Sequence, residues 1–237
     1  MIRGIERLAR DMTAKVFKQE VVANNLANAT TPGFKTQRSF VSMLKGMITG
    51  TGTQAGPVVD TYSSFEQGPI EHTHRSLDLA LDGEGFFAIA TPVGERYTRS
   101  GSFTLTEAGL LATQTGGTVA GTGGPMAIEG GQITVGRDGT VVVDGEEVGM
   151  IRVVTFADPQ ALIREGNMYA SSGQAAREVD FTETAVIQGA LERSNVNPID
   201  EMVEMIALHR NFEAAQRGIR LQDESAKQAI ERVGQFG

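Results

Sequence analysis

A regular spacing of apolar residues near the C-terminus most strongly limits how this chain can fold. From Met205 onward, apolar and small residues alternate at intervals of three and four, the spacing of a coiled-coil seam with a repeat of about 3.5 residues. The positions on this seam are Met205, Leu208, Phe212, Ala215, Ile219, Gln222, Ala226, Ala229, Val233 and Phe236. The pattern predicts a long helix with one face that needs a partner.

The start of this helix is marked by its capping residues. Asn197 is a favourable N-cap and Pro198 suits the first helical position. Asp200 and Glu201 place negative charge in the first turn, where the helix dipole favours it. A helix from Asn197 to about Val233 would be roughly 50 Å long. That length exceeds what the core of one globular domain needs and favours a subunit of a filament.

The N-terminus repeats the three-and-four spacing. Its seam positions are Ile2, Ile5, Ala9, Met12, Val16, Gln19, Ala23 and Leu26. The helix is predicted to run from about Ile2 to Asn28, because Pro32 and Gly33 then stop it and turn the chain. Periodicity alone leaves two interpretations open: the two helices close a core within one subunit, or they pack in a bundle between subunits.

The middle of the chain changes to a period of two, which is typical of short β-strands. Turn dipeptides such as Asp82-Gly83 and Asp144-Gly145 separate the alternating segments. The predicted strands are Leu77–Leu81, Phe86–Ala90, Phe103–Leu105, Ile133–Val135, Val141–Val143 and Val148–Phe156. One helix of about two turns is expected between Asp158, as its N-cap, and Gly166. This pattern predicts an antiparallel sandwich or irregular barrel.

The predicted fold is therefore α+β, a discontinuous helical coiled-coil domain from both termini with an inserted antiparallel β domain. We expect the N-terminal helix and its turn in residues 1–35, an extended linker region in 36–75, the β domain in 76–185 and the C-terminal helix in 186–237. Within the linker region, Ser39–Leu44 is a short helix or strand, Gly46–Pro57 a flexible connection and Val58–Tyr62 a strand.

Composition excludes several classes of function. The net charge is −8 with no long basic run, which argues against a nucleic-acid partner. Cysteine is absent, so disulfides and thiolate metal sites are excluded. No apolar run approaches the roughly 18 residues of a membrane span. Charges recur through the first dozen residues, so no cleaved secretory signal peptide is expected.

The residues that could carry chemistry do not form a recognisable site. His72 and His74 would share one face of a strand, but no third metal ligand accompanies them. The segment Gly121–Pro125 lacks the lysine and the strand–helix context of a phosphate-binding loop. Ser100 lacks a nucleophile elbow, and the carboxylates of Asp78, Asp82 and Glu84 lack calcium-loop spacing. We expect no catalytic residue, no cofactor, no metal and no small-molecule substrate.

Two terminal stretches resemble the signatures of the bacterial flagellar axial proteins. Residues 23–35 (ANNLANATTPGFK) resemble the rod and hook signature, and residues 194–206 (SNVNPIDEMVEMI) resemble the second hallmark of that family. Three inner segments resemble the β domain of rod subunits: Asp82–Ile89, Tyr97–Phe103 and Gly109–Leu111. Within the family, Arg75–Leu81, Gly123–Met126 and the pair Asn197-Pro198 favour the proximal-rod subunits, with the distal-rod subunits next.

The resemblance implies a structural, non-enzymatic subunit of the flagellar basal-body rod that takes part in motility by transmitting torque. It also implies export, unfolded, through the flagellar type III export apparatus, a place in the periplasmic part of the rod, and proximal and distal rod subunits as partners. Seam and signatures together give an expected assembly interface of Asn24, Asn25, Leu26, Asn28, Gly33, Phe34, Asn195, Asn197, Met205, Leu208, Phe212 and Ile219.

Three alternatives remain open at the level of sequence. The asparagine-rich motif fits a local helix C-cap by Asn28 followed by a turn, with no role between subunits. The whole chain could instead be a ligand-binding β module that its helices dimerise. A weaker alternative is a hydrolase with an unrecognised site.

Overall fold

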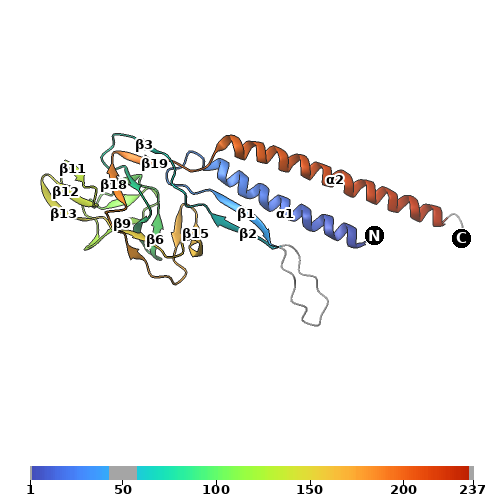
Figure 1. Cartoon of the computed structure of the whole chain (residues 1–237), viewed down its shortest axis with the longest axis horizontal. Coiled ribbons are helices and arrows are strands. Elements are labelled where there is room, and N and C mark those ends of the chain that lie inside the picture. Colours follow the sequence, from blue (N-terminus) through green and yellow to red (C-terminus); the bar gives the residue numbers. More distant parts are fainter. Residues whose placement is uncertain (1, 43–57, 235–237) are drawn as a thin grey trace. The chain divides into compact units, whose positions relative to one another are not determined.

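The computed structural model describes the backbone of residues 2–42 and 58–234, and the side chains of residues 12–39, 60–221 and 224. Within these residues the protein is α+β, with two long helices and many short antiparallel strands (Figure 1). The chain divides into two compact units. The helical unit comprises Met1–Ala27, Gln37–Tyr62 and Asn197–Gly237, and the β unit comprises Asn28–Thr36 and Ser63–Val196. The expected connection Gly46–Pro57 lies outside the described residues.

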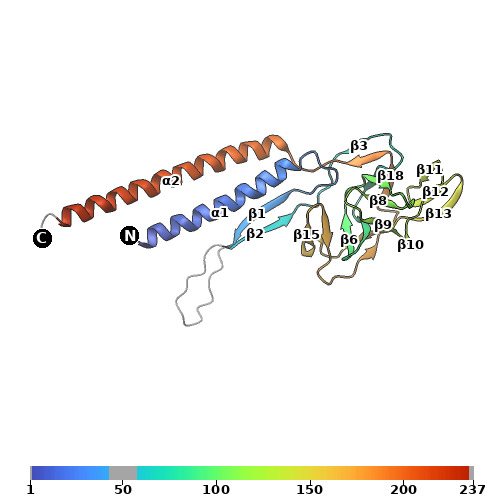
Figure 2. The same cartoon turned by 180° about the vertical axis from the view of Figure 1, so that it is seen from behind.

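The helical unit pairs two helices with a short hairpin. Helix α1 (Ile2–Ala27) and helix α2 (Pro198–Gly234) run antiparallel and side by side in both views (Figures 1 and 2). Strands β1 (Gln37–Ser42) and β2 (Val58–Ser63) form a two-stranded sheet, and β1 contacts α1. The two predicted helices are confirmed. In its described part, neither helix is long and apolar enough to cross a membrane.

The predicted cap of α2 is also confirmed. The Ile199 amide donates to Asn197 Oδ1 at 3.1 Å, and the Glu201 amide donates to the Asn197 carbonyl at 3.1 Å. These bonds satisfy amides that have no partner inside the helix. The cap therefore fixes where α2 begins.

The two predicted seams differ in how far their residues are buried. On α2 the seam residue Leu208 is buried, and Met205, Phe212, Ala215 and Ile219 are half-buried. On α1 the seam residues Met12, Gln19 and Leu26 are half-buried, but Val16 and Ala23 are exposed. The buried residues of this helix are Val21, Val22 and Asn25, which lie off the predicted seam. Because α1 packs against β1 as well as α2, its covered face differs from the seam expected for a helix pair. Seam positions before residue 12 and after residue 221 lie outside the described side chains.

The β unit is built from short strands. They are β3 (Ile70–His72), β4 (Leu79–Asp82), β5 (Phe86–Thr91), β6 (Gly94–Thr98), β7 (Phe103–Leu105), β8 (Leu111–Thr113), β9 (Thr118–Gly121), β10 (Gly124–Pro125), β11 (Ile133–Val135), β12 (Thr140–Val143), β13 (Glu146–Met150), β14 (Val153–Thr155), β15 (Ile163–Glu165), β16 (Met168–Ala170), β17 (Arg177–Glu178), β18 (Ala185–Gln188) and β19 (Ala190–Glu192).

These strands form one large antiparallel sheet and several small ones. The order in the large sheet is β15-β16-β6-β5-β9-β8-β7, with β10 on β9, β14 on β5 and β17 on β14. Strands β11, β12 and β13 form a meander, while β18 pairs with β4 and β19 with β3. The predicted Asp144-Gly145 turn joins β12 to β13, and both residues have a positive φ, of 51° and 91°. That conformation explains why the turn is Asp-Gly.

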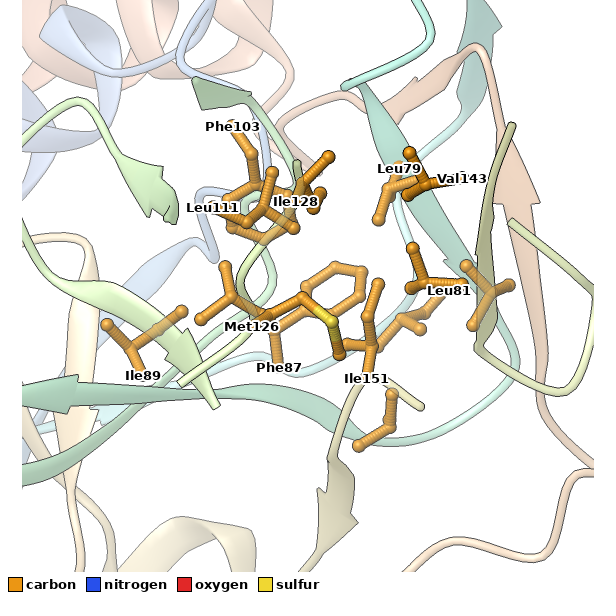
Figure 3. Close-up of a cluster of buried hydrophobic side chains, with 14 residues drawn as sticks. Leu79, Leu81, Phe87, Ile89, Phe103, Leu111, Met126, Ile128, Val143 and Ile151 are labelled. Atoms are coloured by element: carbon orange, nitrogen blue, oxygen red, sulfur yellow. The ribbon is translucent and has the colours of Figure 1, made fainter. Parts of the chain in front are cut away.

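The core of the β unit consists of two clusters. Figure 3 shows the larger one, in which Phe87 and Phe103 meet edge to face with ring centroids 5.2 Å apart. Aliphatic side chains from β4, β12 and β18, among them Leu79, Val141 and Val186, surround them. The smaller cluster is aromatic, with Phe86, Tyr97, Phe156 and Tyr169 in edge contacts. The alternating residues of the sequence thus supply the predicted core.

One segment differs from what the sequence predicts. The helix expected after Asp158 is a single 3-10 turn, Pro159–Ala161. Its cap is present, since Asp158 Oδ1 accepts from the Gln160 amide at 3.0 Å, but β15 takes the last residues assigned to the helix and pairs with β16 across Gly166.

The region 36–75 contains β1, β2 and β3. Strand β2 lies where a strand was predicted at Val58–Tyr62, and β1 overlaps the short helix or strand predicted at Ser39–Leu44.

Candidate assembly site

The N-terminal signature leaves α1 through a tight turn. The Thr31 amide donates to the Asn28 carbonyl at 3.0 Å, and the Thr31 hydroxyl donates to Asn28 Oδ1 at 3.2 Å. Gly33 follows with a φ of +68°, and a Cβ placed on it would lie 2.3 Å from the Ser100 backbone nitrogen. Side chains rarely adopt this φ, and main chain fills the space a side chain would need. Gly33 therefore lets the signature lie directly on the β unit.

The next residue of the signature is buried by a stacked arginine. Phe34 is only 2% exposed, and the Arg164 guanidinium carbon lies 4.1 Å from the centre of its ring. Arg164 Nη1 also donates to the Lys35 carbonyl at 2.8 Å. Burial lowers the pKa of Arg164, which lies near Tyr169 rather than a carboxylate. Phe34 thus works as a packing residue of the β unit.

A buried carboxylate joins the two signatures. Glu192, 1% exposed, accepts from Lys35 Nζ at 2.6 Å and the Gly68 amide at 3.0 Å through Oε1. Its Oε2 accepts from Arg99 Nε at 2.8 Å, and Arg99 Nη2 lies 2.7 Å from the same oxygen as an ion pair. We call Lys35, Gly68, Arg99 and Glu192 the Glu192 cluster. Its backbone takes part too, because the Gly33 amide donates to the Glu192 carbonyl at 2.7 Å.

The Glu192 cluster holds two cations and one anion away from water. Desolvation lowers the pKa of Lys35, and the facing Glu192 carboxylate only partly opposes this shift. The remaining donors of Arg99 reach the carbonyl oxygens of Leu81, Gly83 and Gly85. Removing one partner of such a buried pair typically costs about 3–5 kcal/mol, because an uncompensated charge stays behind. Glu192 is therefore the residue on which both cations depend.

Asn195 of the C-terminal signature is a bridge between backbone segments. Its Oδ1 accepts from the amide and the hydroxyl of Thr36, both at 2.7 Å. Its Nδ2 donates to the carbonyl oxygens of Ser64 and Glu66, both at 2.9 Å. One amide side chain thus satisfies three backbone groups that no strand ladder reaches.

A second asparagine has a similar role inside the helical unit. Asn25, 1% exposed, donates through Nδ2 to the Gln37 carbonyl at 2.8 Å and accepts from the Gln37 amide at 2.9 Å. Nδ2 also lies 3.2 Å from Glu201 Oε1, so α1, β1 and α2 meet at this side chain. Glu201 Oε2 is buried and has no hydrogen-bond partner among the described residues. Burial is the main reason that the pKa of Glu201 is raised.

The start of α2 carries an uncovered apolar stripe. Ile199, Met202, Val203 and Ile206 are 69%, 47%, 62% and 53% exposed. Their spacing of three, four and seven residues places them on one face of the helix. This face differs from the one that Leu208 buries within the unit. We call these four residues the α2 stripe.

The structure distributes the expected interface residues over three environments. Four are buried within their own units: Asn25, Gly33, Phe34 and Leu208. Two are exposed, Asn24 and Asn197, and the remaining six are half-buried: Leu26, Asn28, Asn195, Met205, Phe212 and Ile219.

Sequence reasoning missed Arg99 and Glu192. No local charge pattern identifies them, because Arg99 lies in the polar segment Thr98–Ser102 and Glu192 comes directly after the mostly apolar segment Ala185–Leu191. It also missed the α2 stripe, three residues of which precede the first seam position, Met205.

The histidines do not form a metal site in the described part of the chain. The rings of His72 and His74 stack with centroids 6.4 Å apart on the surface, and His209 lies 3.4 Å from Glu213. Among the side chains of residues 12–39, 60–221 and 224, no three of His, Asp or Glu form a group that could hold a metal ion. A cavity of about 420 Å³ lies beside Phe65 and Phe86, but each nitrogen of Arg99 in its wall already donates to a group of the protein.

Comparison with protein families gives matches over three parts of the chain. Residues 12–35 match the family described as flagella basal body rod protein. Residues 80–143 match the flagellar hook protein FlgE/F/G D1 domain, and residues 187–232 match the flagellar basal body rod FlgEFG protein C-terminal family. The first and third matches contain Phe34, Lys35, Glu192 and Asn195, and the second contains Arg99.

Relatives of known identity match over nearly the whole chain. The rod protein FlgF of Caulobacter vibrioides is 36% identical over 238 residues, which cover 97% of this chain and 96% of that protein. The chain belongs to the flagellar basal-body rod protein family. FlgG of Bacillus subtilis is 35% identical, with 90% and 92% of the two chains covered, and FlgF of Mesorhizobium japonicum is 32% identical, with 91% of each covered. This rod subunit is a structural protein of the flagellar basal body, not an enzyme, and assembles with other rod components.

Proposed function

We propose that the chain is a proximal-rod subunit of the FlgF type. Its alignment with the Caulobacter FlgF spans 238 positions for a chain of 237 residues, so few gaps are needed. The alignment with the Bacillus FlgG extends over 249 positions while covering 90% of the chain, which requires insertions. The sequence details at Arg75–Leu81 and Asn197-Pro198 support the same choice. A distal-rod position is the alternative.

We further propose that the subunit assembles through uncovered faces of its helical unit. The observation that carries this proposal is the α2 stripe, where four apolar side chains with helical spacing stay in water. Burying a side chain of this size yields about 1.5–3 kcal/mol, so a partner surface would gain substantially. On α1 the exposed seam residues Val16 and Ala23 offer a second apolar face. Helix packing between subunits would then use the α2 stripe together with Val16 and Ala23, while the α2 heptad face around Leu208 packs within the chain.

The expected interface residues divide into two roles under this proposal. Asn24, Asn197 and the half-buried seam residues of α2 would meet neighbouring subunits. Asn25, Gly33, Phe34 and Leu208 would act indirectly, by fixing the shape of the units that carry those faces. We also propose that the subunit reaches the periplasmic part of the rod through the flagellar export apparatus.

A charge placed in the α2 stripe tests the assembly proposal. We expect Ile206→Asp to abolish incorporation into basal bodies and motility, because an interface would have to bury an unpaired carboxylate. The matched control is Asn211→Asp, which puts the same group on an exposed part of another helix face. Circular dichroism of the purified chains checks that both variants keep their helices. Normal basal bodies containing folded Ile206→Asp would refute the proposal.

A further inference from the structure

The last part of the β unit supplies partners to segments far away in the sequence. We call residues 185–196 the closing segment. Its strand β18 is the pairing partner of β4 in register Ala185↔Asp82 to Gln188↔Leu79, and β19 is the pairing partner of β3. The described structure pairs β3 and β4 with no other strand. Val186 and Ala190 are buried, so the segment also completes the core.

The closing segment also carries the anion of the Glu192 cluster. Lys35 and Arg99 lie 157 and 93 residues away from Glu192 in the sequence, and both are buried. Without residues after 184, these two cations would face each other in the interior with no carboxylate between them. The backbone of Gly33 would lose its acceptor at the same time. The N-terminal signature therefore has no stable place on an incomplete β unit.

We propose that the closing segment is a conformational lock on the β unit. The signature around Lys35 and the strands β3 and β4 stay unfixed until residues 185–196 dock, and the Glu192 carboxylate makes docking favourable. Once docked, the segment opens only together with the rest of the unit. A chain made from its N-terminus onward thus keeps its β unit open until nearly all of that unit is present. This inference rests on the β unit alone and does not depend on the proposed assembly mode.

Native-state hydrogen exchange of the full-length chain tests the lock. The probes are the amides of Val186 and Gly189, which donate to the carbonyl oxygens of Arg137 and Asp78, both at 2.8 Å. The reference is the Ala88 amide of β5, bonded to the Arg152 carbonyl at 3.0 Å. We expect protection factors of probes and reference to agree within about tenfold, because a cooperative unit opens as one. Probes that exchange more than about 100-fold faster would overturn the proposal.

Two substitutions test the role of the charge. Glu192→Gln keeps the shape but leaves two buried cations unopposed, whereas Lys35→Met leaves the matched pair of Arg99 and Glu192. We expect Glu192→Gln to lower protection of β4 and β18 by about 100-fold or more, and Lys35→Met to lower it by less than about tenfold. Glu178→Gln is the control, since that carboxylate is 70% exposed and 3.9 Å from Arg152.

Each outcome decides the question. If Glu192→Gln fails to fold while Lys35→Met folds, as judged by near-ultraviolet circular dichroism of the buried Tyr97 and Tyr169, the charge argument is supported. If the two variants lose equal protection, or Glu192→Gln behaves like Glu178→Gln, the lock does not depend on the Glu192 charge and the proposal fails.

Discussion

The two units of this rod subunit differ in whether their characteristic side chains are buried with partners or exposed to water. The β unit buries two cations and pairs both with the Glu192 carboxylate, which accepts three hydrogen bonds. The helical unit leaves the four apolar residues of the α2 stripe in contact with water. The buried charges of the β unit thus find their partners within one chain, whereas under the proposed function the α2 stripe would find its partner on another subunit.

The largest expected effect concerns the core of the β unit. Phe87 is fully buried and packs edge to face on Phe103. We expect Phe87→Ala to lower the free energy of unfolding by about 3–5 kcal/mol, through lost burial and the cavity left behind. In contrast, Ile206→Ala in the α2 stripe should change it by no more than about 0.5 kcal/mol in the isolated chain. Urea denaturation measures both changes in unfolding free energy. Equal changes would contradict the proposed difference between the two units.

A second test uses the backbone of the signature. We expect Gly33→Ala to cost about 3 kcal/mol, since the new Cβ meets main chain at 2.3 Å in addition to the unfavourable φ of +68°. Gly116→Ala is the control, because Gly116 has a φ of +91° but a Cβ placed on it would meet no other atom within 4 Å. Its cost should be about 1–2 kcal/mol. Equal unfolding midpoints would show that the close approach at Gly33 contributes nothing.

A third test concerns the hydrogen bonds by which Asn25 joins α1 to β1 within the helical unit. Asn25→Ala removes the partner of both Gln37 backbone groups, so we expect a loss of about 1–3 kcal/mol from that unit. Thermal melting followed by the helical circular dichroism signal measures it. Asn211→Ala, at an exposed position, should melt like the unchanged chain. An Asn25→Ala melt that matches this control would refute the role of Asn25.

The smallest expected effect is a dependence of the helical unit on pH. Burial raises the pKa of Glu201 above its ordinary value of 4.5, so folding favours the protonated form. The stability that protonated Glu201 contributes is fully present below pH 4.5. It is lost as the pH rises through the higher pKa that Glu201 has in the folded chain. Glu201→Gln, which is always neutral, should remove this dependence and slightly stabilise α2 at neutral pH. Superimposable pH profiles of the two chains would contradict the assignment.

Local features of the fold could be predicted from the sequence, and long-range ones could not. The cap at Asn197, the two helices and the Asp144-Gly145 turn depend on neighbouring residues, and all are confirmed. The Glu192 cluster joins residues separated by 93 to 157 positions, and no local pattern indicates which charges will meet. The helix expected after Asp158 has a correct cap, but pairing of β15 with β16 overrides it.

The interface prediction shows the same division. Heptad spacing identified the α2 face around Leu208, yet the structure covers that face with α1 of the same chain. Three residues of the α2 stripe come before Met205, where the heptad pattern was first recognised, and the fourth, Ile206, lies off that seam. A search that follows the heptad face therefore does not find the stripe. Asn25 and Phe34 were selected because the signature contains them. Their burial became visible only when the packing of β1 and of Arg164 was known.

Close backbone crossings have a consequence for how far relatives of this subunit can diverge. A Cβ on Gly68 would lie 2.1 Å from the Arg193 carbonyl oxygen, and one on Gly101 would lie 1.6 Å from that of Leu79. Together with Gly33, these positions strongly favour glycine for reasons internal to the β unit. Their intervals of 35 and 33 residues (from 33 to 68 and from 68 to 101) should persist as a fingerprint in homologues whose helix surfaces have adapted to different neighbours.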